Sequence, residues 1–520
     1  MKKIATLLLA AGLVFGVATG ASAIDFKAKG QWIMSFDYGA NGAFTGGAGA
    51  TGFNGTGRGQ GSYRGEDEFE AKQRVRLQLD AVASESLSGT VFFEMGDQTW
   101  GNAGTGSALG ADGNVVEVKN AYIDWIVPQT DLKVRMGIQG VALPSFTTKA
   151  SSILDDDVAA VTASYQFNEN VGVTALWARP YNDNYNSTNG TPGTNTGSTT
   201  RNNYMDNVDL FALLVPMTFD GVKVTPWMMY GAMGPNAFRN GNAYFGNNAT
   251  ATNGNASRWA TSGMVPVYGS LHKDGTGAAK RLTGYGNAVW AGLTGEVTAF
   301  DPFRIAWDFN YGSVSYDDSR ANRAGYLGSL LFEYKLDWAI PGLYFWYASG
   351  DDDNPANGSE RLPSLHANGN NEFSNFAFSG NPYIARENVL SSTMAGTWGI
   401  GARLKDMSFV ENLKHTLRLN VMGGTNNTKM ASYIRQQGGS ANSYAVGMEP
   451  LYMTTNDTAM EVGLTNTYKV YDNFTIMLDA AYLATWLDHS RSVWGNTTLN
   501  GRSDQVRDPW NVNLSFVYSF

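Results

Sequence analysis

Hydrophobic and polar residues alternate along the last eleven positions of the chain. Apolar side chains occupy every second position, namely Trp510, Val512, Leu514, Phe516, Tyr518 and Phe520. Asn and Ser fill most of the positions between them. Because successive side chains of a β-strand point to opposite faces, this period of two predicts a strand with one apolar and one polar face. A soluble protein rarely leaves so many large apolar groups on its final strand.

The same alternation recurs in segments of roughly ten residues, the length of a tilted strand that crosses a membrane. In segment 69–81, one parity carries Phe69, Ala71, Val75, Leu77, Leu79 and Ala81. The other parity carries Glu70, Lys72, Arg74, Arg76, Gln78 and Asp80. Charged side chains are costly when they face lipid, so this face is expected to line a water-filled interior. A β-sandwich would also alternate, but it would need a second sheet to bury the aromatic face.

Segments of this kind run along the whole chain and predict about 18 strands, with about 16 as the alternative, in line with the even numbers of bacterial barrels. They are 26–38, 69–81, 87–95, 115–127, 132–139, 158–167, 171–178, 208–217, 222–233, 287–300, 303–311, 326–336, 343–349, 394–405, 415–422, 459–470, 474–486 and 510–520. The predicted fold class is therefore all-β, a transmembrane antiparallel β-barrel. Residues 24–520 are expected to form this single domain.

Two kinds of connector alternate between the predicted strands. Short links such as 168–170, 301–302 and 471–473 carry turn-forming residues. Long stretches rich in Gly, Asn, Ser and Thr occupy 40–65, 181–206, 234–286, 350–392 and 424–457. Short periplasmic turns and long extracellular loops are typical of outer-membrane barrels, so both termini are expected at the periplasmic end. Disordered linkers between soluble domains are the alternative, but they would not explain strands at even spacing.

The N-terminus carries the features of an export signal. Two lysines precede the apolar stretch 4–17, and Ala21-Ser22-Ala23 resembles a cleavage site. We therefore expect residues 1–23 to be a signal peptide that is removed on export. The apolar stretch is too short for a membrane-spanning helix, which needs roughly 18 or more residues. An ordinary secreted or periplasmic protein would carry the same signal.

Composition and charge exclude several functional classes. The 520-residue chain has no cysteine, which excludes disulfides and thiolate metal sites. A formal net charge of −9 makes it a poor nucleic-acid binder. The four histidines are scattered without metal-ligand spacing, and the glycine-rich segment 47–52 lacks the following helix that a dinucleotide site needs. We predict no catalytic residue, no cofactor and no metal, and hence no enzyme.

The C-terminal strand with its terminal Phe resembles the assembly signal of bacterial outer-membrane barrels. This resemblance implies that Tyr518 and Phe520 are read by the barrel-assembly machinery before the strand closes the barrel. The whole chain resembles a porin, and more narrowly the homotrimeric outer-membrane porins of sulfate-reducing bacteria. The narrower match lies in Asp25–Gly30, Leu132–Gly137, Glu461–Lys469 and the terminal Phe. It implies an outer-membrane location among lipids and lipopolysaccharide, a homotrimer, and passive diffusion of small polar solutes.

In porins the third outer loop folds into the barrel and narrows it, and the connector 140–157 holds that place here. This candidate constriction loop contains Lys149 and ends in Asp155, Asp156 and Asp157. Basic residues on the polar face of the second and fifth predicted strands are expected opposite it, namely Lys72, Arg74, Arg76, Lys133 and Arg135. An acidic loop against a basic wall would set a transverse field across the narrowest point. The alternative is that these charges only solvate the wall.

These features predict a porin, a water-filled channel for passive diffusion of small hydrophilic solutes and ions. A substrate-selective channel is the first alternative, because aromatic residues such as Trp227 and Trp346 could face inward. A structural or adhesive outer-membrane protein is the second alternative, but no repeat or adhesive motif supports it.

Overall fold

The computed structural model describes residues 24–41, 50–51, 62–63, 68–110, 116–182, 205, 207–235, 237, 263–264, 284–366, 371–378, 383–384, 389–436, 451–488, 490, 493 and 508–520. The expected signal peptide, residues 1–23, lies outside the described residues.

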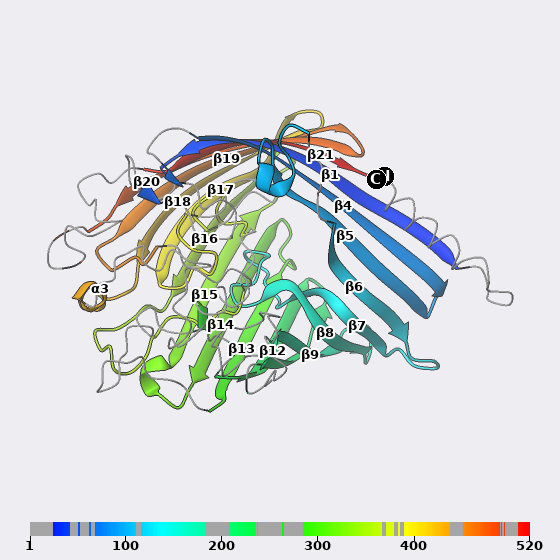
Figure 1. The fold of residues 1–520 in the computed structure, drawn as a ribbon, viewed down its shortest axis with the longest axis horizontal. Coiled ribbons are helices and arrows are strands. Elements are labelled where there is room, and N and C mark those ends of the chain that lie inside the picture. Colours follow the sequence, from blue (N-terminus) through cyan, green and yellow to red (C-terminus); the bar gives the residue numbers. More distant parts are fainter. Residues whose placement is uncertain are drawn as a thin grey trace.

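The described residues form one closed barrel of antiparallel strands (Figure 1). Its strands are β1 (Asp25–Ala40), β4 (Glu68–Ser84), β5 (Leu87–Thr99), β6 (Glu117–Ile126), β7 (Lys133–Ala142), β8 (Asp155–Gln166), β9 (Gly172–Asn182), β10 (Asn207–Leu214), β11 (Met217–Phe219), β12 (Val222–Met233), β13 (Gly286–Val297), β14 (Phe303–Ser315), β15 (Arg323–Tyr334), β16 (Ile340–Ala348), β17 (Thr397–Val410), β18 (Leu413–Gly424), β19 (Thr458–Tyr471), β20 (Phe474–Trp486) and β21 (Trp510–Ser519). Because β10 and β11 both pair with β12, they form one arm, and the wall has 18 strands. β1 pairs with both β4 and β21, which closes the ring. The predicted 18-stranded antiparallel barrel is confirmed.

The remaining elements belong to connectors. They are the short strands β2 (Ala50–Thr51) and β3 (Ser62–Tyr63), the 3-10 turns η1 (Ala103–Thr105) and η3 (Ser319–Ala321), and the helix α3 (Thr428–Gln436). Within the described part of the chain, no helix is long and apolar enough to span a membrane.

The two faces of the barrel wall differ in polarity as the alternation predicts. Trp177, Phe211 and Tyr230 are direct neighbours on β9, β10 and β12, and all three are exposed on the outside. On the inside, Asn513 of β21 donates a 2.6 Å hydrogen bond to Ser35 of β1, and both side chains are buried. A closed barrel that is apolar outside and polar inside is the architecture of a bacterial outer-membrane protein, so the predicted location holds.

Short turns lie at one end of the barrel, and long connectors lie at the other. The turns at 85–86, 220–221 and 411–412 each join neighbouring strands. Gly221 has a φ of 66°, and a Cβ there would lie 2.6 Å from the Ala299 backbone, so this turn requires glycine. Asp25 pairs with Val82 beside the first of these turns, which places the start of β1 at the short-turn end.

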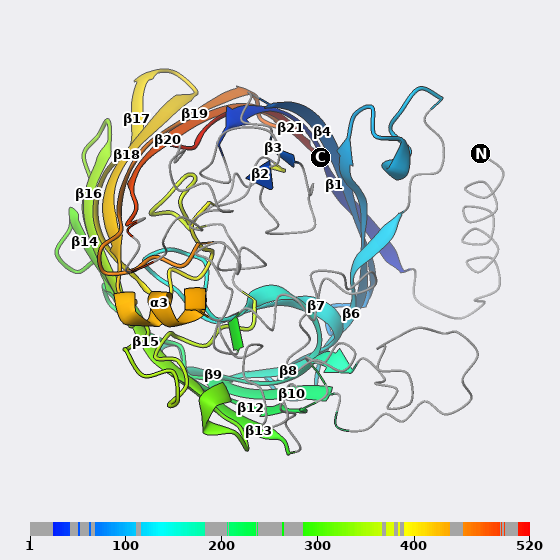
Figure 2. The ribbon, with the colours of Figure 1, turned by 60° about the vertical axis from the view of Figure 1, so that its left-hand side comes forward.

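The hydrophobic core lies inside the barrel rather than between two packed sheets. Inward side chains of the wall, such as Trp290 and Tyr344, contribute one part of it. The other part comes from two connectors, represented by Ile153 and Phe373. Figure 2 shows these connectors, the one after β7 in cyan and the one after β16 in yellow, within the ring of strands.

The last residue of the chain belongs to the closing seam. Phe520 and Gly30 exchange two backbone hydrogen bonds of 2.9 and 3.0 Å. The Phe520 ring packs against Trp32 and Tyr518, with centroid distances of 5.4 and 6.0 Å. A Cβ at position 30 would lie 2.5 Å from the Phe520 ring, so the glycine leaves room for the terminal side chain.

Deleting Phe520 removes both backbone hydrogen bonds and the ring contacts at the seam. We therefore expect the amount of folded protein in the outer membrane to fall several-fold, measured by heat-modifiable gel mobility of membrane fractions. Phe219→Ser is the matched control, since it removes an exposed ring at the end of β11, away from the seam. Equal levels of folded protein in the parent and the deletion variant would contradict this role.

Candidate functional site

The connector between β7 and β8, residues 143–154 (loop 3), crosses the interior and is attached to β14. Asp308 of β14 accepts hydrogen bonds of 2.8 Å from the Ser145 hydroxyl and from the backbone N–H groups of Phe146 and Thr147. The Thr147 hydroxyl donates a further hydrogen bond to the same carboxylate. Asp308 is buried, so these donors take the place of water around its charge. One carboxylate therefore fixes the tip of loop 3.

The boundaries of this loop differ from those expected from the sequence. The expected loop 140–157 begins and ends with residues that extend the flanking strands, because Ala142 and Asp155 are paired in the β7–β8 ladder. Asp155, Asp156 and Asp157 thus open strand β8 instead of ending the loop. The sequence analysis placed these strand ends in the loop because three consecutive aspartates are unusual in a strand.

The connector between β16 and β17, residues 349–396 (loop 7), also enters the interior where it is described. The Phe373 ring stacks on Tyr344 of β16, with centroids 4.2 Å apart. Glu461 of β19 accepts hydrogen bonds of 2.8 and 2.9 Å from the backbone N–H groups of Asn375 and Phe376. Wall residues on both sides of the connector therefore hold it in place.

Loops 3 and 7 also bind each other. The backbone N–H of Leu365 donates to the Ile153 carbonyl at 2.9 Å, and the N–H of Asp155, the first residue of β8 after loop 3, donates to the His366 carbonyl at 2.9 Å. Further along, the N–H of Glu372 donates to the Thr148 carbonyl at 3.1 Å. The two loops thus form one connected body inside the barrel.

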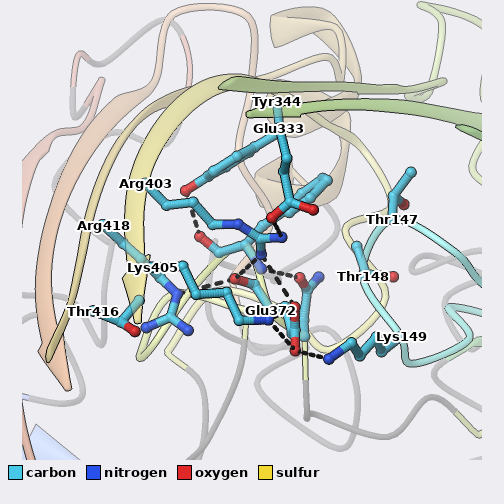
Figure 3. Close-up of polar contacts among 12 residues, drawn as sticks. Thr147, Thr148, Lys149, Glu333, Tyr344, Glu372, Arg403, Lys405, Thr416 and Arg418 are labelled. Carbon is cyan, nitrogen blue, oxygen red and sulfur yellow. Dashed lines mark hydrogen bonds and ion pairs between the residues drawn. The ribbon is translucent and has the colours of Figure 1, made fainter. Parts of the chain in front are cut away.

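A charged cluster lies where this body meets the wall, and we call it the Glu372 cluster (Figure 3). Its members are Glu372 of loop 7, Lys149 of loop 3, Arg403 and Lys405 of β17, and Arg418 of β18. The Glu372 carboxylate contacts Lys149, and it lies 3.2 Å from both Arg403 Nη1 and Lys405 Nζ. Arg418 Nε donates to the Glu372 main-chain carbonyl at 3.0 Å. Burial alone would raise the pKa of Glu372, but Lys405, Lys149 and Arg403 lower it to about 2.

A chain of ion pairs continues from this cluster along the wall. Glu333 of β15 lies 2.6 Å from Arg403 and 2.7 Å from Arg304 of β14. Arg304 also pairs with Glu296 of β13 at 2.8 Å and donates to the Phe146 carbonyl of loop 3 at 2.8 Å. Acidic and basic side chains therefore alternate along this chain of ion pairs from β13 to β17.

The basic residues predicted on β4 lie on a different part of the wall. Each has an acidic partner nearby, Lys72 with Glu70 at 2.5 Å, Arg74 with Asp97 at 2.5 Å and Arg76 with Glu94 at 2.7 Å. Arg74 is buried and also lies 3.7 Å from Glu94. Strand β5 thus supplies the acids beside Arg74 and Arg76, whereas Glu70, the partner of Lys72, lies on β4 itself.

Most of the other predicted residues also have partners of their own. Arg135 pairs with Asp124 of β6 at 2.6 Å, and Lys133 is exposed near the short-turn end of β7. Asp157 contacts Lys119 of β6, whereas Asp156 lies 3.1 Å from His366 of loop 7. Among the residues that the structure describes, no ion pair joins the predicted basic residues of β4 and β7 to Asp155, Asp156 or Asp157.

The sequence interpretation missed the Glu372 cluster, although part of its signal was present. Arg403 and Lys405 share the polar parity of the segment 394–405, and Lys149 stands in the candidate loop. Glu372 lies in a long connector without periodicity, so no local pattern related it to those cations.

Comparisons with known proteins give distant structural similarity. No protein-family model matches the sequence, and no curated protein matches it. Among solved structures, the chain is similar to Pseudomonas aeruginosa OprD at 9% identity, covering 96% of this chain and 97% of that chain with a TM-score of 0.49. It is similar to Pseudomonas aeruginosa OpdK at 10% identity, covering 95% and 98% with a TM-score of 0.47. It is also similar to Pseudomonas aeruginosa OpdO at 11% identity, covering 95% and 97% with a TM-score of 0.46.

Replacing Asp308 with Asn should loosen loop 3, because an amide nitrogen would then face donors that need an acceptor. Each buried donor left without a partner costs about 1–3 kcal/mol. The chain has no native cysteine, so Ala150→Cys provides a single buried thiol in loop 3. We expect this thiol to react several-fold faster in the Asp308→Asn background. Asp472→Asn, at the exposed β19–β20 turn, is the control and should leave the reaction rate of the thiol unchanged. Equal rates for Ala150→Cys alone, with Asp308→Asn and with Asp472→Asn would show that Asp308 does not hold the loop.

Proposed function

We propose that the protein is a substrate-selective channel of the bacterial outer membrane that passes small hydrophilic solutes through a narrowed interior. The observation that supports this most directly is the inward fold of loops 3 and 7. Asp308 attaches one loop to the wall and Glu461 attaches the other. A barrel of about 18 strands is wide enough for an aqueous passage, and the two loops reduce its cross-section. We therefore place selective transport above the general diffusion that the sequence suggests.

The interior has one side where apolar loop residues pack on the wall and another side that is mainly polar. This difference supports a channel that selects solutes by their chemistry over one that selects them by size alone. On the side of β14 to β19, loop residues such as Phe373 and Phe378 are buried against the wall. On the side of β21, β1 and β4, most of the inward groups are polar, such as Ser35, Asn513 and Arg74, and the apolar contact of Ile384 with Ile33 and Val517 is small. A solute between these sides would meet fixed charges in defined places, and charges that line a pore bias which solutes enter.

The assignments of the sequence analysis that concern the passage remain proposals. We retain Lys72, Arg74 and Arg76 as pore-lining candidates because they share the inner parity of β4. We rank Arg135 and Asp155–Asp157 lower, since their partners lie within β6 to β8 or loop 7, and Lys133 lower because it is exposed near the short-turn end of β7. A homotrimer embedded in lipid and lipopolysaccharide is proposed on the sequence resemblance alone, as is recognition of Tyr518 and Phe520 by the assembly machinery.

Reconstitution in a planar bilayer tests the proposed function. We expect single-channel conductance that is reduced in a saturable manner by some small polar solutes and unaffected by others of equal size but different charge. Equal effects of size-matched cationic, neutral and anionic solutes would favour a general diffusion porin. Absence of conductance from folded protein would favour a structural or adhesive role.

Replacing Arg74 and Arg76 together with Gln tests the β4 candidates. The variant loses two positive charges that pair with Glu94 and Asp97, so the reversal potential in a salt gradient should shift toward cation preference. At 1 M salt the screening length falls to about 3 Å, which should reduce the shift. The double variant Lys414→Gln/Lys469→Gln removes the same charge near the short turns and is the control. An unchanged reversal potential at low salt would mean that Arg74 and Arg76 only solvate the wall.

A further inference from the structure

We propose that Glu372 is a tethered counter-ion, whose carboxylate occupies an anion-binding site on the barrel wall and lowers the preference of the channel for anions. The site without Glu372 would take a small monocarboxylate such as acetate. This inference rests on the proposed channel function and names the residue that sets the ion preference of its interior.

The carboxylate of Glu372 is bound as a free carboxylate ion would be. Three cations from two separate elements surround it, Lys149 from loop 3 and both Arg403 and Lys405 from β17. Lys405 Nζ lies 3.4 Å from one carboxylate oxygen and 3.2 Å from the other, so it bridges the group. Charge-assisted hydrogen bonds of this kind are the strongest contacts that proteins offer a carboxylate.

The site belongs largely to the wall and should persist without the Glu372 side chain. Arg403 is held separately by Glu333 at 2.6 Å, and Arg418 is held by Thr465 of β19 at 3.1 Å. The Arg403 side chain is only 1% exposed. Its Nε is buried and has no hydrogen-bond partner among the residues that the structure describes. The Arg403 guanidinium therefore has one N–H group available for a further hydrogen bond.

Loop 7 does not depend on the Glu372 carboxylate alone for its position. The Glu372 main chain accepts from Arg418 and donates to Thr148, and neither contact involves the carboxylate. The neighbouring residues Asn375 and Phe376 are bound by Glu461. Removing the carboxylate should therefore uncover positive charge in the interior while the loop remains in place.

The first test compares Glu372→Gln with Glu411→Gln, which removes one negative charge from the exposed β17–β18 turn. In a salt gradient at low ionic strength, Glu372→Gln should raise the anion-to-cation permeability ratio several-fold. Glu411→Gln should leave that ratio at its parental value. Equal ratios in the two variants would overturn the proposal.

The second test is chemical rescue of Glu372→Ala. Acetate added equally to both sides should return the permeability ratio toward the parental value, whereas uncharged acetamide should not. The parent protein, whose site is filled by Glu372, should not respond to acetate in this way. A Glu372 that served only to hold the loop would give no rescue, or the same acetate effect in the parent and the variant, and either result would overturn the proposal.

A binding measurement separates this proposal from the proposed function. Acetate should raise the melting temperature of detergent-solubilised Glu372→Ala protein and leave the parent unchanged, because a ligand that binds only the folded state stabilises it. A selective acetate effect in protein that does not conduct would contradict the channel and support the site. Conductance without any selective acetate effect would support the channel and contradict the site.

Discussion

Lipid offers no hydrogen-bond partner to a backbone N–H or C=O group, and the architecture of this protein follows from that constraint. Each wall strand must be paired on both sides, so the sheet closes through β1, which pairs with β4 and β21 along most of its length. Pairing extends to the final residue, where Phe520 and Gly30 exchange backbone hydrogen bonds. Once closure satisfies the backbone, the alternating side chains separate an apolar exterior from a polar interior.

Inside the barrel, the connectors obtain backbone partners from single carboxylates on the wall. Asp308 accepts from consecutive residues at the tip of loop 3, and Glu461 accepts from consecutive residues of loop 7. A loop without a neighbouring strand cannot pair residue by residue, so one acceptor with two oxygens serves several N–H groups at once. Glu372 reverses this arrangement, because there the loop supplies the carboxylate and the wall supplies the donors.

The sequence revealed the strands more fully than the contacts of the loops, for a physical reason. A strand between lipid and water repeats every two residues, so segments such as 69–81 and 510–520 are recognisable without knowledge of their neighbours. Asp155–Asp157 were placed in a loop because their composition suggested a turn, whereas the ladder with β7 extends over them. The partners of Glu372 are set by how two long connectors pack inside the barrel. That packing depends on residues distant in sequence and leaves no local periodicity.

The closing seam also determines the order in which this protein can fold. Gln31 and Ser519 are neighbours across the seam although 488 positions separate them along the chain. Contacts between such distant residues carry a large loop-closure entropy and form slowly. The ring can therefore be completed only after the whole chain is available, and until then the edges of β1 and β21 remain unpaired. Unpaired strand edges promote aggregation, so the incompletely folded chain must be kept from aggregating in the aqueous compartment before it enters the bilayer.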